Sequence, residues 1–250
     1  MSYIGTSDFD YQVGLGNVPG WTTWNKFGYN DNLPIGTEII AEFGGTWTPM
    51  TAAETMSVVS TSALDVSGSS GAASILISGL DGNYDHVEEL VFLNGLTPVT
   101  TTNSFLGINR CVIYLAGSGR INAGDITCTS TTSATTEARI LAAQGTTQQC
   151  IYHTSATGTI LMRNLTINAL KLSGGAAPKV TVKAWVYSDV SKATYEVFRV
   201  DMDTAVDNHL EHVQQIPFVV GNKSSIWFEA TSDKVGAGIN VRFSFVEYDT

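Results

Sequence analysis

The stretch Ile239-Asn240-Val241-Arg242-Phe243-Ser244-Phe245 alternates strictly between apolar and polar side chains. Successive side chains of a β-strand point to opposite faces of a sheet, so the four apolar residues are expected to share one face. The three polar residues between them would then lie on the other face. The pattern predicts a strand that packs one side against a hydrophobic core.

Shorter runs of β-branched and aromatic residues precede this stretch, with turn residues about every ten positions, as in sandwiches and barrels. Asn94-Gly95, for example, favours a type I′ hairpin turn. We therefore predict an all-β chain whose residues 51–250 form an antiparallel β-sandwich of the jelly-roll-like kind. A subdivision near 173–179 is an alternative to a simple loop there. Strands are expected at 74–78, 87–93, 111–116, 125–129, 137–141, 150–153, 159–162, 180–187 and 239–245.

The first fifty residues are rich in glycine, asparagine, proline and aromatic residues, and they show neither strand nor helix periodicity. Large rings in irregular backbone need a groove to fill, on the same chain or on a neighbour. Residues 1–50 are therefore predicted to form an extended N-terminal arm that docks onto another surface. The anchoring rings would be Trp21, Trp24, Phe27 and Trp47.

One segment, 204–215, is compatible with a short helix that Pro217 would end. Its apolar residues fall on roughly one face of such a helix. They are Ala205, Val206, Leu210 and Val213. His209 and His212 would share a face of the same turn, but two ligands make no stable zinc site, so no metal is expected.

The charge balance argues against a nucleic-acid partner. Lys and Arg number 13, Asp and Glu number 23, and the net charge is −10, with no basic cluster. Such a chain would repel a phosphate backbone, so we expect no nucleic-acid partner. No apolar run approaches the length of a membrane helix, and the first residues lack the features of a signal peptide. The charged fraction of 14% suits surfaces that meet other proteins.

Motifs that carry chemistry are weak. Gly14-x-Gly16-x-x-x-Gly20 misses the dinucleotide-binding spacing by one residue, and adjacent Glu88 and Glu89 would point to opposite faces of a strand. We expect no cofactor and no enzymatic activity. The cysteines lack CxxC spacing and are predicted to be free, buried thiols. They are Cys111, Cys128 and Cys150.

The segment Val58 to Asn109 carries a family resemblance. Its matching pieces include Ile77-Ser78-Gly79-Leu80-Asp81-Gly82-Asn83-Tyr84, Glu89-Leu90-Val91-Phe92-Leu93-Asn94-Gly95 and the run from Thr97 to Phe105. It resembles virion structural proteins of tailed, often marine, bacteriophages, which are variously labelled capsid decoration, head fibre or tail proteins. The resemblance implies a non-enzymatic virion protein that is made in the cytoplasm of a bacterial host.

These observations favour a capsid-surface decoration or cement protein, or a head-fibre subunit. It would be a homotrimer that binds other virion proteins such as the major capsid protein. The first alternative is a tail-fibre or tail-tip protein that binds a host-surface glycan, with Trp185, Tyr187 and Trp227 stacking on sugar rings. A remote alternative is a virion polysaccharide depolymerase, which would need paired carboxylates.

Overall fold

The computed structural model describes residues 9–213 and 218–249, and it confirms the prediction of an all-β chain with antiparallel sheets. Most of the strands expected from the sequence are present within a residue or two of their predicted bounds. The elements are α1 (Phe9–Gly14), β1 (Trp21–Leu33), β2 (Gly36–Ile39), β3 (Met56–Ser60), β4 (Ala72–Leu80), β5 (His86–Phe92), β6 (Val99–Thr100), β7 (Gly107–Ala116), β8 (Ile126–Ser130), β9 (Thr136–Ile140), β10 (Ile151–His153), β11 (Gly158–Lys171), β12 (Lys179–Ser188), β13 (Ala193–Asp203), β14 (His209–Val213), β15 (Val219–Val220), β16 (Ser224–Ser232) and β17 (Ala237–Asp249).

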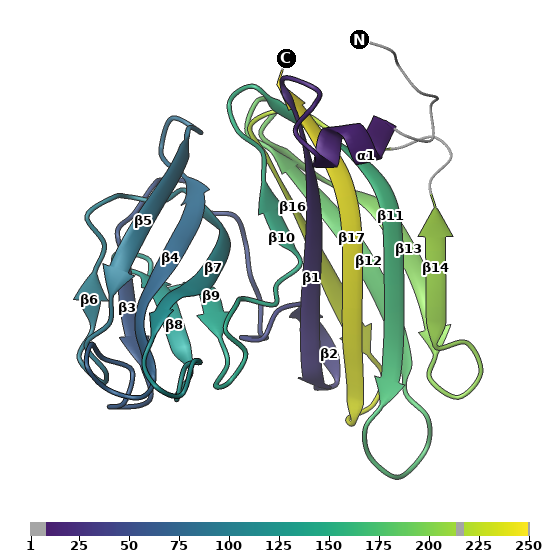
Figure 1. The fold of residues 1–250 in the computed structure, drawn as a ribbon. Coiled ribbons are helices and arrows are strands. Elements are labelled where there is room, and N and C mark those ends of the chain that lie inside the picture. The colour runs from purple at the N-terminus through teal and green to yellow at the C-terminus, as the bar shows by residue number, and fades with distance from the viewer. Residues whose placement is uncertain (1–8, 214–217, 250) are drawn as a thin grey trace.

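The strands form two units that lie side by side (Figure 1). The larger unit contains β1, β2 and β10 to β17, and the smaller unit contains β3 to β9. The smaller unit is thus an insertion between β2 and β10. The single domain expected over residues 51–250 therefore needs correction. Residues 173–179 lie in the connection between β11 and β12, inside the larger unit.

The larger unit has a nested pairing order. One sheet runs β1-β17-β11-β14, with β15 also paired to β11, and the other runs β10-β16-β12-β13. With β2 and β15 left aside, the first strand pairs with the last, the second with the seventh, the third with the sixth, and the fourth with the fifth. These pairs are β1–β17, β10–β16, β11–β14 and β12–β13, all antiparallel.

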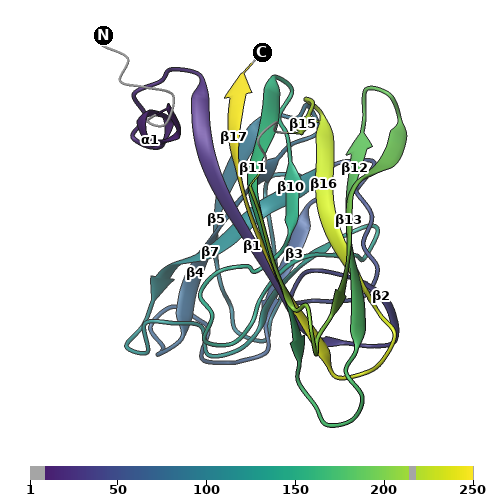
Figure 2. The same cartoon turned by 90° about the vertical axis from the view of Figure 1, so that its right-hand side faces the viewer.

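The two sheets of the larger unit bury one hydrophobic core between them. Figure 2 shows β1, β17 and β11 on one side, and β16, β12 and β13 on the other. Ile239, Val241, Phe243 and Phe245 all face this core and are essentially inaccessible to water, as their alternation predicts. Strand β17 is flanked by β1 and β11, which explains why its pattern is the clearest in the chain.

The smaller unit also has two sheets around one core, with orders β6-β3-β8-β9 and β5-β4-β7. Its loops are held by two carboxylates. Buried Asp65 accepts hydrogen bonds from the backbone N–H groups of Ala72 (2.8 Å), Ala123 (2.8 Å) and Gly124 (2.9 Å) and from the Ser60 hydroxyl (2.5 Å).

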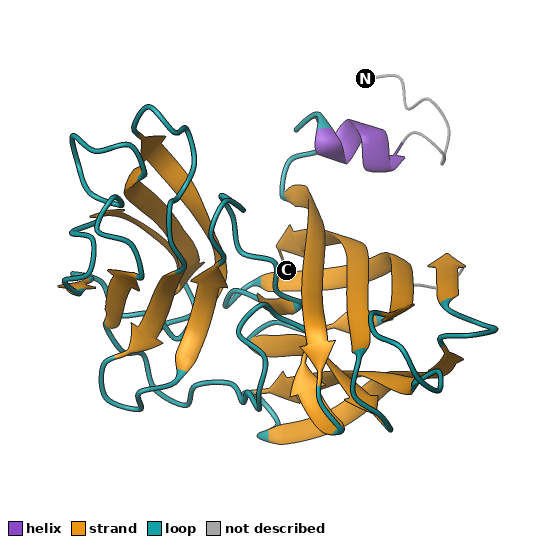
Figure 3. Ribbon diagram, turned by 90° about the horizontal axis from the view of Figure 1, so that it is seen from below, coloured by secondary structure: helices purple, strands orange, loops and turns teal. Residues whose placement is uncertain are grey.

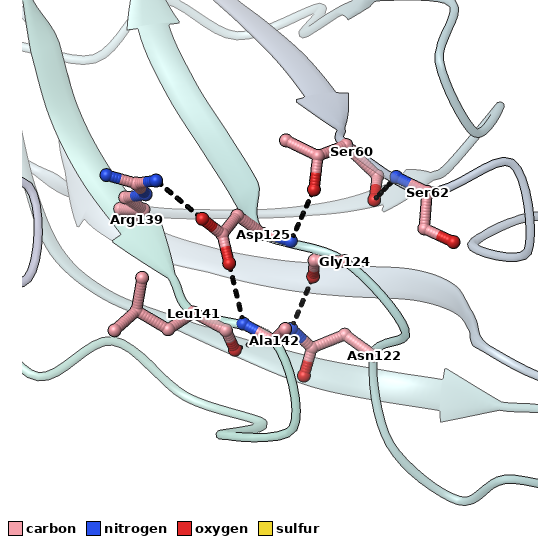
Figure 4. A network of polar contacts seen from close by, with 9 residues as sticks. Ser60, Ser62, Asn122, Gly124, Asp125, Arg139, Leu141 and Ala142 are labelled. Atoms are coloured by element: carbon pink, nitrogen blue, oxygen red, sulfur yellow. Dashed lines mark hydrogen bonds and ion pairs between the residues drawn. The ribbon is translucent and has the colours of Figure 1, made fainter.

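The second carboxylate, Asp125, lies at the next turn of the smaller unit (Figure 4). It accepts a hydrogen bond from the backbone N–H of Ala142 at 2.8 Å and forms an ion pair with Arg139. The Asn122 side chain beside it donates to the carbonyl oxygens of Gly124 (2.8 Å) and Leu141 (2.7 Å). Side-chain hydrogen bonds thus hold these loops in place where the backbone has no regular secondary structure. Figure 3 shows how much of the smaller unit is loop.

The predicted N-terminal arm needs correction for residues 21–33. They form β1, which pairs with β17 along its length. The inward positions of β1 include Lys26, Gly28 and Asn30 rather than a row of hydrophobic residues. Because these positions carry little apolar signal, the period-two pattern of a strand is hidden in the sequence.

The predicted helix at 204–215 is also wrong. Residues 209–213 form β14, which pairs with β11, and Leu210 packs against the core of the larger unit. Gln214 and Gln215 lie outside the described residues. A short apolar pattern fits both helix and strand, and here the open edge of β11 offers hydrogen-bond partners to the backbone.

Candidate contact surface

The three-stranded sheet β5-β4-β7 of the smaller unit has apolar side chains on both faces. Ile75, Ile77 and Val91 point into the core. The alternate positions point outward and form what we call the contact surface, which consists of Leu76, Leu90, Phe92, Val112 and Tyr114. Leu76 pairs with Leu90 on one side and with Val112 on the other, so these three lie in one row across the sheet.

The contact surface is accessible to water. Phe92 and Tyr114 are 57% and 59% exposed, Leu90 is 38% exposed, and Leu76 and Val112 are half-buried. An antiparallel sheet with one solvated face normally places polar residues there. A group of exposed apolar residues on a regular sheet departs from this pattern and makes the face a candidate interaction site. Among residues 9–213 and 218–249, Figures 1 and 2 show no layer of strands over the outer side of this sheet.

Two opposite charges border the contact surface on opposite edge strands. Ser78 on the central strand pairs with Glu88 of β5 and with Arg110 of β7. The Ser78 hydroxyl donates to Glu88 Oε1 at 2.7 Å, and Arg110 Nε donates to Thr146 Oγ1 at 3.4 Å. Polar and charged residues beside an apolar centre are typical of protein–protein interfaces.

The contact surface is attached to the larger unit through a hydrogen-bonded seam. The Asn109 side chain donates to the carbonyl oxygen of His153 at 3.1 Å and accepts from the backbone N–H of His153 at 2.8 Å. Gln149 Nε2 donates to the carbonyl oxygen of Ile108 at 3.1 Å, and Lys26 Nζ donates to that of Asn109. These bonds connect β7 to β10 and β1, and so fix the two units to each other.

The seam contains ionisable groups that are shielded from water. Burial, reinforced by the charge of Lys26, lowers the pKa of His153 to about 3, and the ring lies 2.8 Å from Ser225 Oγ through Nδ1. Burial also lowers the pKa of Lys26 to about 8, because the charged form loses its hydration. His153 is therefore neutral at neutral pH and acts as a packed, hydrogen-bonded residue.

The predicted docking rings do not share one surface. Trp21 stacks on Tyr248 with ring centroids 4.7 Å apart, and Trp24 donates through Nε1 to Glu247 Oε2 at 3.1 Å. Trp47 is buried at the seam and donates to Glu137 Oε2 at 3.0 Å. Phe27 faces outward and is 39% exposed. Trp24 and Phe27 lie on opposite faces of β1, so these rings cannot anchor a common arm.

The three rings proposed for glycan stacking do come together. Trp185 and Trp227 are cross-strand neighbours, and Tyr187 lies beside them in a cluster with Trp47. Trp227 is only 5% exposed, and its ring centroid is 5.7 Å from that of Trp47. Because residues around 39–47 cover this part of the sheet, the Trp227 ring packs inside the protein and has no face free for a sugar.

The sequence contains a signal for the contact surface that lies outside the motifs of catalysis and ligand binding. The run Ile75-Leu76-Ile77 is apolar at both strand phases, as is Leu90-Val91-Phe92. An exposed antiparallel strand needs only one apolar phase. Apolar residues in the second phase therefore indicate a second apolar face, which is a candidate contact surface.

The cysteines are buried in the two cores. All three cysteines are buried and free, as predicted, and the Sγ atoms of Cys111 and Cys128 are 3.8 Å apart across the smaller core. Within residues 9–213 and 218–249, no group of three or more His, Cys, Asp and Glu residues is arranged to hold a metal ion. The same residues contain no helix of the length and apolarity that a membrane crossing requires.

Comparisons with known proteins found similarity among solved structures, with low TM-scores. No protein-family model matches the chain. No curated protein sequence matches it either. Among solved structures, the infectious bursal disease virus VP2 subviral particle is 11% identical over 93% of this chain and 77% of that one, with a TM-score of 0.20.

Two further structures give similar values. The infectious bursal disease virus Gt strain structure is 11% identical over 96% of this chain and 82% of that one, with a TM-score of 0.18. A Bacillus thuringiensis Cry1Da tryptic core variant is 8% identical over 82% and 52%, with a TM-score of 0.19. Scores this low carry no argument about function, which must come from the surface itself.

Proposed function

We propose that the chain is a non-enzymatic structural protein of a bacteriophage particle, held in place through the contact surface. The nested strand order of the larger unit supports a jelly roll, an eight-stranded, two-sheet fold that serves in viral capsid domains and also in lectins and cupins. Because one fold hosts many functions, the order of strands alone does not select among these.

The observation that carries the proposal is the apolar second face of β5-β4-β7. Leu90, Phe92 and Tyr114 project from a rigid sheet, and the sheet is tied to the larger unit by the seam. Burial of apolar area contributes about 25 cal/mol per Å². In a particle with many copies, symmetry multiplies such a contact into avidity. The low charge of the chain fits the same role, since few ions must be desolvated at the contacts.

The proposed place is the capsid surface, as a decoration or cement protein or as a head-fibre subunit. Its partners would be further copies of the chain, in a homotrimer, and other virion proteins such as the major capsid protein. A tail-fibre or tail-tip position is the alternative, and it would use the same surface for a different neighbour. The sequence resemblance covers both places, and it includes the strands β4 and β5 that carry most of the contact surface.

Analytical ultracentrifugation of the purified chain tests the self-association part of the proposal. The wild-type chain is expected to form a trimer, whereas Leu90→Glu/Tyr114→Glu should sediment as a monomer with an unchanged unfolding temperature. Val206→Glu, at an 86% exposed position of the larger unit, is the matched control and should remain trimeric. A wild-type chain that is monomeric at all concentrations, or a trimer that survives the double substitution, would contradict self-association through this surface.

A further inference from the structure

The outer face of the sheet β1-β17-β11-β14 carries a polar groove of about 230 Å³. We define the polar groove by its lining residues, which are Asn25, Asn164, Thr166, Glu211, Arg242 and Ser244. They come from all four strands of the sheet, and so the sheet itself fixes their spacing. Figure 1 shows this sheet at the front of the larger unit, with α1 over its upper end.

The register arranges the lining residues in two rows. Ser244 lies between Asn25 and Asn164 in the first row. In the second row Arg242 pairs with Thr166, and Thr166 pairs on its other side with Glu211. Phe27 lies at the end of the second row as the cross-strand neighbour of Arg242, with its ring 39% exposed. The polar groove is therefore a flat array of short polar groups bordered by an aromatic ring.

The polar atoms of these side chains are not used inside the protein. Within the described part of the chain, none of the six lining side chains makes a hydrogen bond or ion pair with another residue. Elsewhere in the chain, polar side chains on strands commonly have partners, as Ser78 and Thr181 do with Glu88 and Asp201. The groups in the polar groove thus keep their full capacity for an external ligand.

The chemistry of the groove selects a class of ligand. The two amides and two hydroxyls both donate and accept, Arg242 only donates, and Glu211 only accepts. The single positive and single negative charge balance, so the array favours neither an anion nor a cation. The groove also lacks the buried apolar anchors on which protein–protein affinity depends.

We propose that the polar groove binds a neutral carbohydrate, by contacts from Asn25, Asn164 and Arg242 to sugar hydroxyls. A sugar hydroxyl donates and accepts, as the lining groups do, and the apolar C–H face of a sugar ring can cover the exposed Phe27 ring and remove it from water. A shallow groove with few contacts implies weak binding of a single sugar, with a Kd of about 1 mM. The inference does not depend on the proposed particle role, since it concerns a different unit and a different face.

NMR of the ¹⁵N-labelled full chain observes the groove directly, because the side-chain amides of Asn25 and Asn164 and the Nε–H of Arg242 give their own signals. The probes are glucose, galactose, mannose and N-acetylglucosamine, with sialic acid as an anionic comparison. We expect saturable shifts of the three reporter signals with at least one neutral sugar. Unchanged reporters with all four sugars, larger shifts with sialic acid, or reporter shifts on dilution without sugar would each overturn the assignment. The last result would show that a second copy fills the groove.

Two substitutions link the signal to the proposed contacts. Arg242→Gln and Asn164→Ala should each weaken sugar binding by about tenfold or more, because each removes hydrogen bonds to the ligand. Neither should change the unfolding temperature, since neither side chain has an internal partner. Arg120→Gln, at an exposed arginine of the smaller unit, is the matched control and should bind like the wild type. Wild-type affinity in Arg242→Gln and Asn164→Ala would exclude the groove as the site.

Discussion

The side chain of Asn109 and the backbone of His153 form two reciprocal hydrogen bonds, at 3.1 and 2.8 Å, across the seam between the two units. A side-chain amide here does what a neighbouring strand does in a sheet, because it supplies one donor and one acceptor in the same plane. The seam therefore needs no continuous sheet to join the smaller unit to the larger one. Both groups are buried, so both depend on the pairing.

Asn109→Ala removes both hydrogen bonds and leaves the N–H and carbonyl groups of His153 buried without these partners. We expect the free energy of unfolding to fall by about 2–3 kcal/mol, the cost of unsatisfied buried polar groups. Urea unfolding followed by tryptophan fluorescence measures the change. Asn208→Ala, on an exposed loop, is the control and should shift it by less than about 0.5 kcal/mol. A loss no larger than that of the control would contradict the structural role of the pair.

The buried ring of His153 predicts that the free energy of unfolding falls at acidic pH. The unfolded chain takes up a proton on this histidine below about pH 6.5, whereas the folded chain does so only near its pKa of about 3. The stabilising contribution is therefore complete above pH 6.5 and is lost as the pH falls from there towards 3, by about 1.4 kcal/mol per pH unit. His153→Gln should lose about 2 kcal/mol less than the wild type between pH 6.5 and 5. Denaturant titrations at both pH values test this, and equal slopes for the two proteins would disprove it.

Asp65 holds three separate segments of the smaller unit through its two carboxylate oxygens. Asp65→Asn keeps the shape but turns one oxygen into a donor that faces other donors. We expect a loss of about 3 kcal/mol in the free energy of unfolding, as for a broken buried network. Asp85→Asn, in an exposed turn, is the matched control. An Asp65→Asn protein as stable as this control would show that the network contributes little.

The three thiols should not react in the native protein. The hydrogen bond with Cys128 and burial hold the pKa of Cys111 well above its usual range, and burial raises the pKa of Cys150. The thiolate is the reactive form, so both effects suppress reactivity. A thiol-reactive chromophore should label none of the cysteines until denaturant unfolds the chain, and then all three. Rapid labelling of the native protein would indicate that a core opens.

A strand of this fold can be predicted from the sequence where hydrophobic residues occupy successive positions on its inward face. Strand β17 has hydrophobic residues at four consecutive inward positions, and this alternation predicts a strand. Strand β1 instead places Lys26, Gly28 and Asn30 inward, so its sequence does not show the pattern of a strand. The sequence of β14 also fits a helix, because its five residues have no local preference strong enough to decide between helix and strand. Its conformation is set by β11, which is distant in sequence.

The insertion of the smaller unit and the seam could not be read from local patterns. No local pattern near β2 or β10 indicates that a separate unit, residues 56–140, lies between them, because pairings such as β1 with β17 connect opposite ends of the chain. The contact surface could be predicted from the sequence, through the two apolar phases of residues 75–77 and 90–92. The polar groove could not be predicted from the sequence, since separate Asn, Ser and Arg residues form a site only when four strands bring them together.

The central claim is that the chain is a particle component held through the face of β5-β4-β7. Electron cryomicroscopy of purified particles of the proposed bacteriophage is the most direct test. The account predicts ordered copies of this chain in the density, with Leu90, Phe92 and Tyr114 covered by a neighbouring subunit. Washed particles that lack the chain, or copies whose β5-β4-β7 face is open to solvent, would contradict it.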